Sequence, residues 1–97
     1  MQIIDDNTVV VNNSEEFKKA LSEENDYNYI YLGNDITLTS GFTINANKTN
    51  LIIDGTYNNV KYTYTNNLNE SSDVIEASTS NRKITLKNIN IISSHTY

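Results

Sequence analysis

Short apolar runs recur along the chain, and turn-forming residues separate most of them. The clearest run is Leu51-Ile52-Ile53, which Asp54-Gly55 closes, and a second run extends from Ile84 to Ile92. Runs of this length that are rich in β-branched residues and bounded by turn formers are typical of buried strands. Residues 8–11 and 29–32 have the same character. The hydrophobic pattern therefore predicts a mostly β protein.

Apolar positions also recur at a constant spacing. They form three series with members 24 residues apart: Ile36, Val60 and Ile84; Leu38, Tyr62 and Leu86; and Ile44, Leu68 and Ile92. A fixed period in the twenties is typical of a solenoid, in which short strands of successive turns stack into parallel sheets. The period predicts that the members of each series lie one above another. The alternative is a small antiparallel sandwich with coincidental spacing.

Residues 13–25 predict a short helix with one apolar face. Asn13 is expected as the N-cap, with Glu16 at the partner position of a capping box, and Asn25-Asp26 is expected to end the helix. The apolar residues lie at the i, i+3, i+4 spacing of one face: Phe17, Ala20 and Leu21. A helix this short is not stable alone, so its apolar face must cover another part of the chain.

Residues 9–21, 30–36 and 51–55, together with the later run 84–89, resemble the opening of pectate-lyase-like right-handed β-helix proteins, in their bacterial surface, adhesin-like branch. The resemblance covers residues 8–92. It implies a mostly β fold, a short right-handed parallel β-helix of about three coils with an N-terminal amphipathic capping helix. We therefore expect one domain over residues 1–97, with the first strand and capping helix in 8–25 and the coils in 29–92. These motifs mark a fold and not a reaction.

The composition argues against some classes of binding partner. The 97 residues carry a formal net charge of −5, which argues against nucleic acid because phosphate binding needs a basic face. The absence of cysteine excludes disulfides, and no apolar run is long enough to span a membrane. Seventeen asparagines and no proline indicate that Asn serves most turns. The first six residues lack the features of a signal peptide. We expect a secreted or cell-surface location from the resemblance, and a cytoplasmic one if the chain is complete as written.

Few groups are available for catalysis. The chain has one arginine, Arg82, and one histidine, His95, close to its last residue. The enzymes of the resembled superfamily cleave acidic polysaccharides with clustered carboxylates and a basic residue, or with paired aspartates, and neither set is matched here. We expect no catalytic residue, no cofactor and no metal site. Asp35 is expected to accept turn amides in preference to binding calcium. A truncated polysaccharide lyase stays as the enzymatic alternative.

Tyrosines give the best candidate for a binding surface. Tyr29 and Tyr31 share the strand face opposite Ile30 and Leu32, so that face is the outside if the aliphatic residues point inward. Outward tyrosines on a parallel sheet would form an aromatic strip suited to sugar rings or to another protein. The candidate surface comprises Tyr29, Tyr31, Tyr62 and Tyr64. The alternative is that these residues cover loops or supply strand propensity.

The last apolar run predicts a second surface. Neither a polar cap nor a second helix follows it, so the final coil would expose strand edges and apolar side chains. The residues concerned are Ile84, Leu86, Ile89, Ile91 and Ile92. We expect them to be covered by more chain in a longer parent, by a second copy in a homo-oligomer, or by a foreign partner.

Two non-enzymatic hypotheses remain open beside the truncated lyase. The first is a non-catalytic β-helix scaffold and recognition module of a bacterial surface or secreted protein, with a glycan or a protein as its partner. The second is a stand-alone small acidic protein inhibitor, for example one encoded by a phage, that acts by protein–protein binding in the cytosol.

Overall fold

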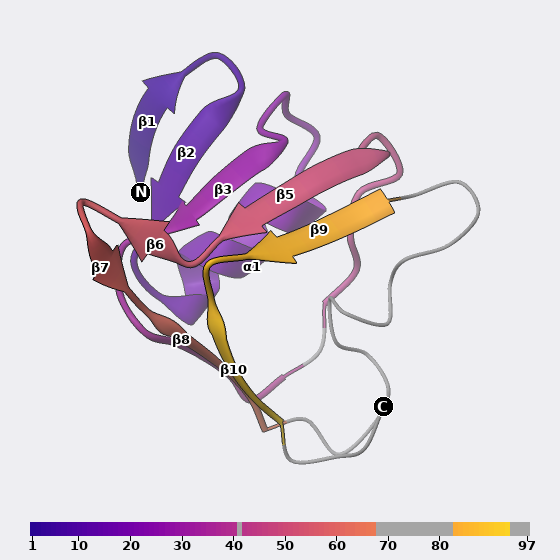
Figure 1. Cartoon of the computed structure of the whole chain (residues 1–97). Helices are drawn as coiled ribbons and strands as arrows, with labels where there is room; N and C mark the ends of the chain where they lie inside the picture. Colours follow the sequence, from indigo (N-terminus) through magenta and orange to yellow (C-terminus); the bar gives the residue numbers. More distant parts are fainter. Residues whose placement is uncertain (41, 68–82, 94–97) are drawn as a thin grey trace.

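The structure, a computed structural model, describes residues 1–40, 42–67 and 83–93 (Figure 1). Their one helix is short, and ten strands accompany it. In chain order the elements are β1 (Gln2–Asp5), β2 (Thr8–Val11), α1 (Ser14–Ser22), β3 (Tyr29–Leu32), β4 (Ile36–Leu38), β5 (Asn50–Asp54), β6 (Thr56–Tyr57), β7 (Val60–Lys61), β8 (Thr63–Asn66), β9 (Lys83–Lys87) and β10 (Asn90–Ser93). The predicted mostly β class is confirmed.

The strands form three sheets. The largest has the order β1-β2-β3-β5-β9, the second has the order β10-β8-β4, and β6 pairs with β7. Strands β2, β3, β5 and β9 run parallel, as do β4, β8 and β10, whereas β1 is antiparallel to β2 and β6 is antiparallel to β7. Figure 1 shows β8 and β10, which belong to the second sheet, running at an angle to the strands of the five-stranded sheet. Since the largest sheet is mixed and the third is an antiparallel hairpin, this topology does not establish a three-coil parallel β-helix.

The register predicted from the 24-residue spacing is wrong. Ile36 pairs with Tyr64 and Ile84 pairs with Leu51, while Val60 lies in the β6–β7 hairpin and is 47% exposed. Leu68, a member of the third series, lies outside the described residues. Inward aliphatic residues do form a row across the parallel strands, at positions 9, 30, 53 and 86. This row is unequally spaced in the sequence because connections of different lengths join its strands.

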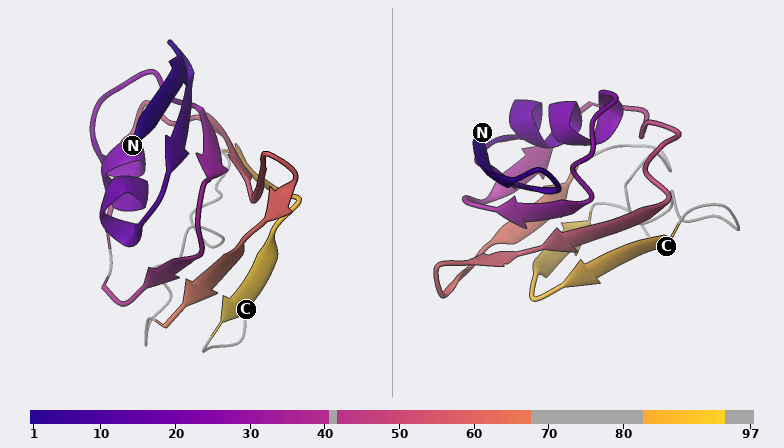
Figure 2. Two further views of the ribbon diagram at one scale, coloured as in Figure 1. Left: turned by 90° about the vertical axis from the view of Figure 1, so that its left-hand side faces the viewer. Right: turned by 90° about the horizontal axis from the view of Figure 1, so that it is seen from above.

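The predicted helix cap is confirmed, although the helix is shorter than expected. The side chain of Asn13 accepts a hydrogen bond from the backbone N–H of Glu16 at 2.9 Å. The Glu16 carboxylate in turn accepts the backbone N–H of Asn12, one residue before the cap, at 3.0 Å. The helix ends at Ser22. It contacts β2 and β4 and covers one end of the two sheets (Figure 2).

The hydrophobic core lies between α1 and the inner faces of the two larger sheets. Phe17 is fully buried, with its ring centroid 6.0 Å from that of Phe42 and 5.5 Å from that of Tyr64. The buried cluster also contains the inward residues of β2, β3, β4 and β5: Val9, Val11, Ile30, Leu32, Ile36, Leu38, Leu51 and Ile53. The apolar face of the helix therefore closes the core at the N-terminal end.

Asparagine serves the tightest turns, as the composition predicts. Asn58, Asn59 and Asn88 are the non-glycine residues with positive φ among those described, at 51°, 65° and 51°. Asn58-Asn59 forms the two-residue loop between Tyr57 and Val60, where both central residues of a primed hairpin turn need positive φ. Asn88 turns the chain between β9 and β10. Asn tolerates this left-handed region better than other residues with side chains.

Gly55 is required because two chain segments approach each other closely here, and not because of its backbone conformation. None of the described glycines has a positive φ. A Cβ at residue 55 would instead lie 2.5 Å from the Cβ of Ile89 and 2.7 Å from the carbonyl oxygen of Asn88. The chain after β5 therefore passes directly against the corner between β9 and β10, where only a residue without a side chain fits.

A fully buried lysine joins two loops beside the helix. The Nζ of Lys48 donates to the carbonyl oxygens of Tyr27 at 2.6 Å and Asn25 at 3.2 Å, and also to the side-chain oxygen of Asn25. Burial lowers the pKa of Lys48, and the negative charge of Asp26 opposes that shift. These bonds tie residues 45–49 to the segment that follows α1.

Candidate functional site

The outer face of β3 carries the tyrosines that the sequence analysis singled out. Ile30 and Leu32 are fully buried, while Tyr29 and Tyr31 are half-buried on the opposite face. The ring centroids of Tyr29 and Tyr31 are 4.9 Å apart, and that of Tyr31 is 5.3 Å from the ring centroid of Tyr57 in β6. We call Tyr29, Tyr31 and Tyr57 the tyrosine ridge. It is a continuous row of three rings on the outside of the five-stranded sheet.

A buried carboxylate anchors one end of the ridge. Asp54, at the end of β5, is 5% exposed. Its Oδ2 accepts the phenolic O–H of Tyr29 at 2.7 Å, and its Oδ1 accepts the backbone N–H of Thr56 at 3.0 Å. Burial, followed by the hydrogen bond to Asp54, raises the pKa of Tyr29. Tyr29 is therefore held as a neutral phenol in a fixed position.

A positive charge adjoins the same end. Lys87 is exposed on β9, and its Nζ lies 5.4 Å from the ring centroid of Tyr29. A cation over an aromatic face is attracted by the negative face of the ring. Lys87 thus lies over the ring of Tyr29, whereas the ring of Tyr31 packs against the rings of Tyr29 and Tyr57.

Two tyrosines of the predicted binding surface lie elsewhere. Tyr64 is 1% exposed and belongs to the core, where it packs on Phe17, so its assignment to a binding surface is wrong. Tyr62 lies between β7 and β8 in the chain, is half-buried and packs against the core. Tyr57 was not part of the predicted binding surface, because the β6–β7 hairpin that places it beside Tyr31 was not predicted. The adjacent pair Asn58-Asn59 was the signal that could have located that hairpin.

The residues of the second predicted surface come from the last two strands and their corner. Ile84 and Leu86 in β9 and Ile89 at the corner are half-buried and pack against the core. In β10, Ile91 is 41% exposed and Ile92 is 57% exposed. Strands β9 and β10 are edge strands of their sheets. The structure therefore places the five residues at one end of the molecule, opposite the end that α1 covers.

The acidic residues are not gathered into a reactive centre. Within residues 1–40, 42–67 and 83–93, no three His, Cys, Asp or Glu side chains are placed to hold a metal ion together. Asp35 accepts a backbone amide, as expected, but that amide belongs to Thr63 in β8, at 2.8 Å. Arg82, His95 and Asp73 lie outside the described residues. No helix in the described ranges has the length and apolar character needed to cross a membrane.

A surface hollow lies next to the β1–β2 turn and the segment that follows α1. Its volume is about 510 Å³, and it is lined by Ile3, Asp5, Asp6, Asn25, Asp26 and Tyr27. Asp5 accepts the backbone N–H of Asn7 at 2.8 Å, which fixes its carboxylate in the turn. Three carboxylates beside an aliphatic and an aromatic side chain suit a cation with an apolar stem.

The described residues form a β-rich protein with a half-exposed row of tyrosines on a sheet of mainly parallel strands. The chain matches the family of pectate lyase-like adhesive domains over residues 8–97, and it belongs to this family. The predicted pectate-lyase-like, adhesin-type resemblance is therefore confirmed. Neither a curated protein nor a solved structure matches the chain.

Proposed function

We propose that this adhesive domain is non-catalytic and binds glycan chains along the tyrosine ridge. The observation that carries the proposal is the contact of three tyrosine rings on an outward sheet face, with centroid separations of 4.9 and 5.3 Å. Aromatic rings that are apolar on their faces and polar at their hydroxyls suit sugar rings, which combine C–H faces with hydroxyl rims. Tyr31 and Tyr57 would contact the sugar, and Tyr29 would position Tyr31.

The surroundings of the ridge favour binding over catalysis. Asp54, the carboxylate that contacts the ridge among the described residues, is buried and accepts two hydrogen bonds from the protein, so it is poorly placed to take a proton from a substrate. Lys87 is exposed beside Tyr29 and can donate hydrogen bonds to sugar hydroxyls. The family of adhesive domains gives more support to this function than to a cytosolic inhibitor.

The parallel strands also support a role for the domain as a scaffold. The parallel pairing of β2, β3, β5 and β9 in one sheet, and of β4, β8 and β10 in another, supports a short right-handed β-helix closed at one end by α1. In this proposal the domain is a scaffold of a surface or secreted protein, and it presents the ridge on its outer wall.

Glycan-array binding of the 97-residue chain tests the proposed ligand, followed by titration of the strongest glycan. Tyr31→Ser and Tyr57→Ser are each expected to weaken binding roughly three- to tenfold, the equivalent of one aromatic contact. Tyr31→Phe keeps the ring and is the matched control, with binding close to that of the unmodified chain. Equal binding by the serine variants, or no glycan bound by the unmodified chain, would contradict the proposal.

A further inference from the structure

One carboxylate contacts both of the strands that carry the tyrosine ridge. Tyr29 and Tyr31 lie in β3, whereas Tyr57 lies in β6. The Oδ2 atom of Asp54 accepts the phenolic O–H of Tyr29 at 2.7 Å, and its Oδ1 atom accepts the backbone N–H of Thr56 at 3.0 Å. Thr56 directly precedes Tyr57 in the chain. The two oxygens of Asp54 therefore bind groups beside both ends of the ridge.

Burial makes this link strong. Asp54 is 5% exposed, and in the sheet it lies between Tyr31 of β3 and Lys87 of β9. Hydrogen bonds that a carboxylate accepts are stronger than those between neutral groups, and the low dielectric of a buried site adds to their strength. Losing one of them would leave a buried polar group without its partner, which is costly. Both bonds are therefore expected to be present before any ligand binds.

The hairpin that carries Tyr57 is anchored at its base. The backbone N–H of Gly55 donates to the carbonyl oxygen of Lys87 at 3.0 Å, and the Thr56 hydroxyl donates to the carbonyl oxygen of Asn88 at 2.8 Å. These two bonds tie the start of β6 to the corner between β9 and β10. The bond from the Thr56 N–H to the buried carboxylate adds a tie to β3, where the other two rings of the ridge lie.

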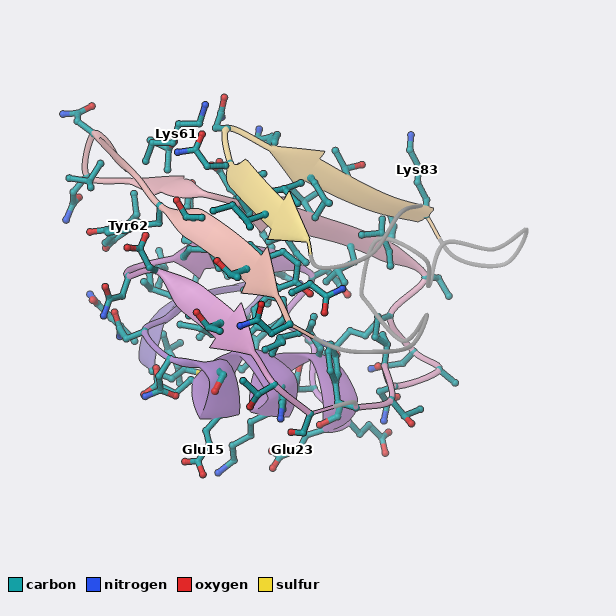
Figure 3. The ribbon with its side chains drawn as sticks, turned by 90° about the horizontal axis from the view of Figure 1, so that it is seen from below. Glu15, Glu23, Lys61, Tyr62 and Lys83 are labelled. Atoms are coloured by element: carbon teal, nitrogen blue, oxygen red, sulfur yellow. The ribbon has the colours of Figure 1, made fainter. Side chains whose placement is uncertain are left out.

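The rest of the hairpin projects from the molecule (Figure 1). Val60 is 47% exposed, and Lys61 is exposed as well. Figure 3 shows Lys61 on the side of the molecule opposite Glu15 and Glu23. Tyr57, which pairs with Val60, is therefore positioned from the base of the hairpin.

We propose that Asp54 is the positioning residue of the tyrosine ridge, and that it holds β3 and β6 together so that Tyr31 and Tyr57 meet a glycan as a preformed pair. The proposal rests on the proposed function for its ligand, and it adds the residue that sets the geometry of the binding face. Asp54 is buried, so it acts through Tyr29 and Thr56 and not by touching the sugar. Rings that are fixed in advance lose less conformational freedom on binding, which raises the affinity.

Glycan titration of Asp54→Asn tests the effect on binding. Asn keeps one acceptor oxygen and replaces the other with an NH₂ donor, so it cannot accept from both partners in the geometry of the carboxylate. Binding is expected to weaken roughly three- to tenfold, the equivalent of one misplaced ring. Tyr29→Phe breaks one of the two bonds without altering Asp54, and is expected to weaken binding in the same direction but less.

Two spectroscopic measurements report the ring geometry without a ligand. The chain has no tryptophan, so its near-ultraviolet circular dichroism comes from tyrosine and phenylalanine. Asp54→Asn is expected to reduce this signal while the far-ultraviolet signal of the fold is unchanged. The variant is also expected to lower the pKa of Tyr29 toward its ordinary value, because the bond to Asp54 adds to the effect of burial in raising it.

Asp35→Asn is the matched control. Asp35 also accepts a backbone amide, that of Thr63 at 2.8 Å, and its substitution removes the same charge, but its partner lies in β8 and not in a strand of the ridge. Binding and near-ultraviolet signal are expected to stay as in the unmodified chain.

The outcomes separate this proposal from the proposed function. Undiminished binding in Asp54→Asn and Tyr29→Phe, unchanged tyrosine spectra in Asp54→Asn, or equal changes in Asp35→Asn would overturn the positioning role. A chain that binds no glycan would contradict the proposed function alone, because the spectra still decide whether Asp54 positions the rings.

Discussion

The two ends of the molecule differ in how completely they are buried. At the N-terminal end, Phe17, Ala20 and Leu21 of α1 are 1% exposed or less and cover the inward residues of β2 and β4. At the other end, Leu86 is half-buried, and Ile91 and Ile92 are exposed. Among the described residues, every buried side chain precedes residue 67.

Because of this difference in burial, similar apolar residues contribute unequally to stability at the two ends. Full burial of an aliphatic side chain is worth about 1.5–3 kcal/mol relative to exposure, so the closed end contributes most of the hydrophobic stabilisation. The half-buried row at β9 gains only part of that free energy on folding.

The same substitution at the two ends should give the largest contrast. Leu21→Ala empties a fully buried position in α1 and is expected to lower the free energy of unfolding by about 2–5 kcal/mol, by loss of transfer free energy and creation of a cavity. Leu86→Ala, at a half-buried position, is expected to cost about half as much or less. Urea denaturation followed by circular dichroism measures the free energy of unfolding of both variants. Equal losses would show that the ends do not differ in packing.

Lys48→Met tests how far the closed end depends on polar bonds. The change removes the donor that serves two carbonyl oxygens and the Asn25 side chain, while it keeps much of the apolar stem. Leaving buried acceptors unsatisfied costs about 1–3 kcal/mol, and we expect a loss of unfolding free energy in this range. Lys61→Met, at an exposed position, is the matched control and should change stability little. A Lys48→Met variant as stable as the unmodified chain would exclude this role.

The smallest expected effect is the pH dependence of fold stability that arises from Tyr29 in the tyrosine ridge. Because the folded-state pKa of Tyr29 is raised, its neutral form stabilises the fold below the ordinary tyrosine pKa of about 10, and this contribution is lost as the pH rises above that value. Alkaline titration of tyrosinate absorbance should therefore lose a step above the ordinary tyrosine pKa in Tyr29→Phe. A titration curve that is unchanged in this pH range in the variant would contradict the raised pKa of Tyr29.

The local features of the fold could be predicted from the sequence. Asn13 caps the helix, Phe17 and Leu21 face the core, and residues 8–11 form β2, because each depends on neighbours close in the chain. The register could not be predicted, since it depends on the lengths of the connections between strands. Ile36 pairs with Tyr64 and not with the residue 24 positions on.

The candidate site could be predicted only in part, because it too depends on contacts between distant parts of the chain. Tyr29 and Tyr31 alternate with buried aliphatic residues within one strand, so their face followed from parity alone. Tyr64 was misplaced because β8 turns it inward onto Phe17, a contact between distant parts of the chain. Strand β1 was not foreseen, since its four exposed residues gain order by pairing with β2 and bury little themselves.

The close approach at Gly55 limits how this sequence can vary. Loops between the strands differ in length and can accept insertions without disturbing the rows they connect. Residue 55 has no such freedom, because even a methyl group would overlap the main chain at Ile89 and force β9 and β10 apart at their corner. Any side chain at residue 55 therefore requires the main chain at this corner to move, whereas the loops between strands can change in length without such a shift.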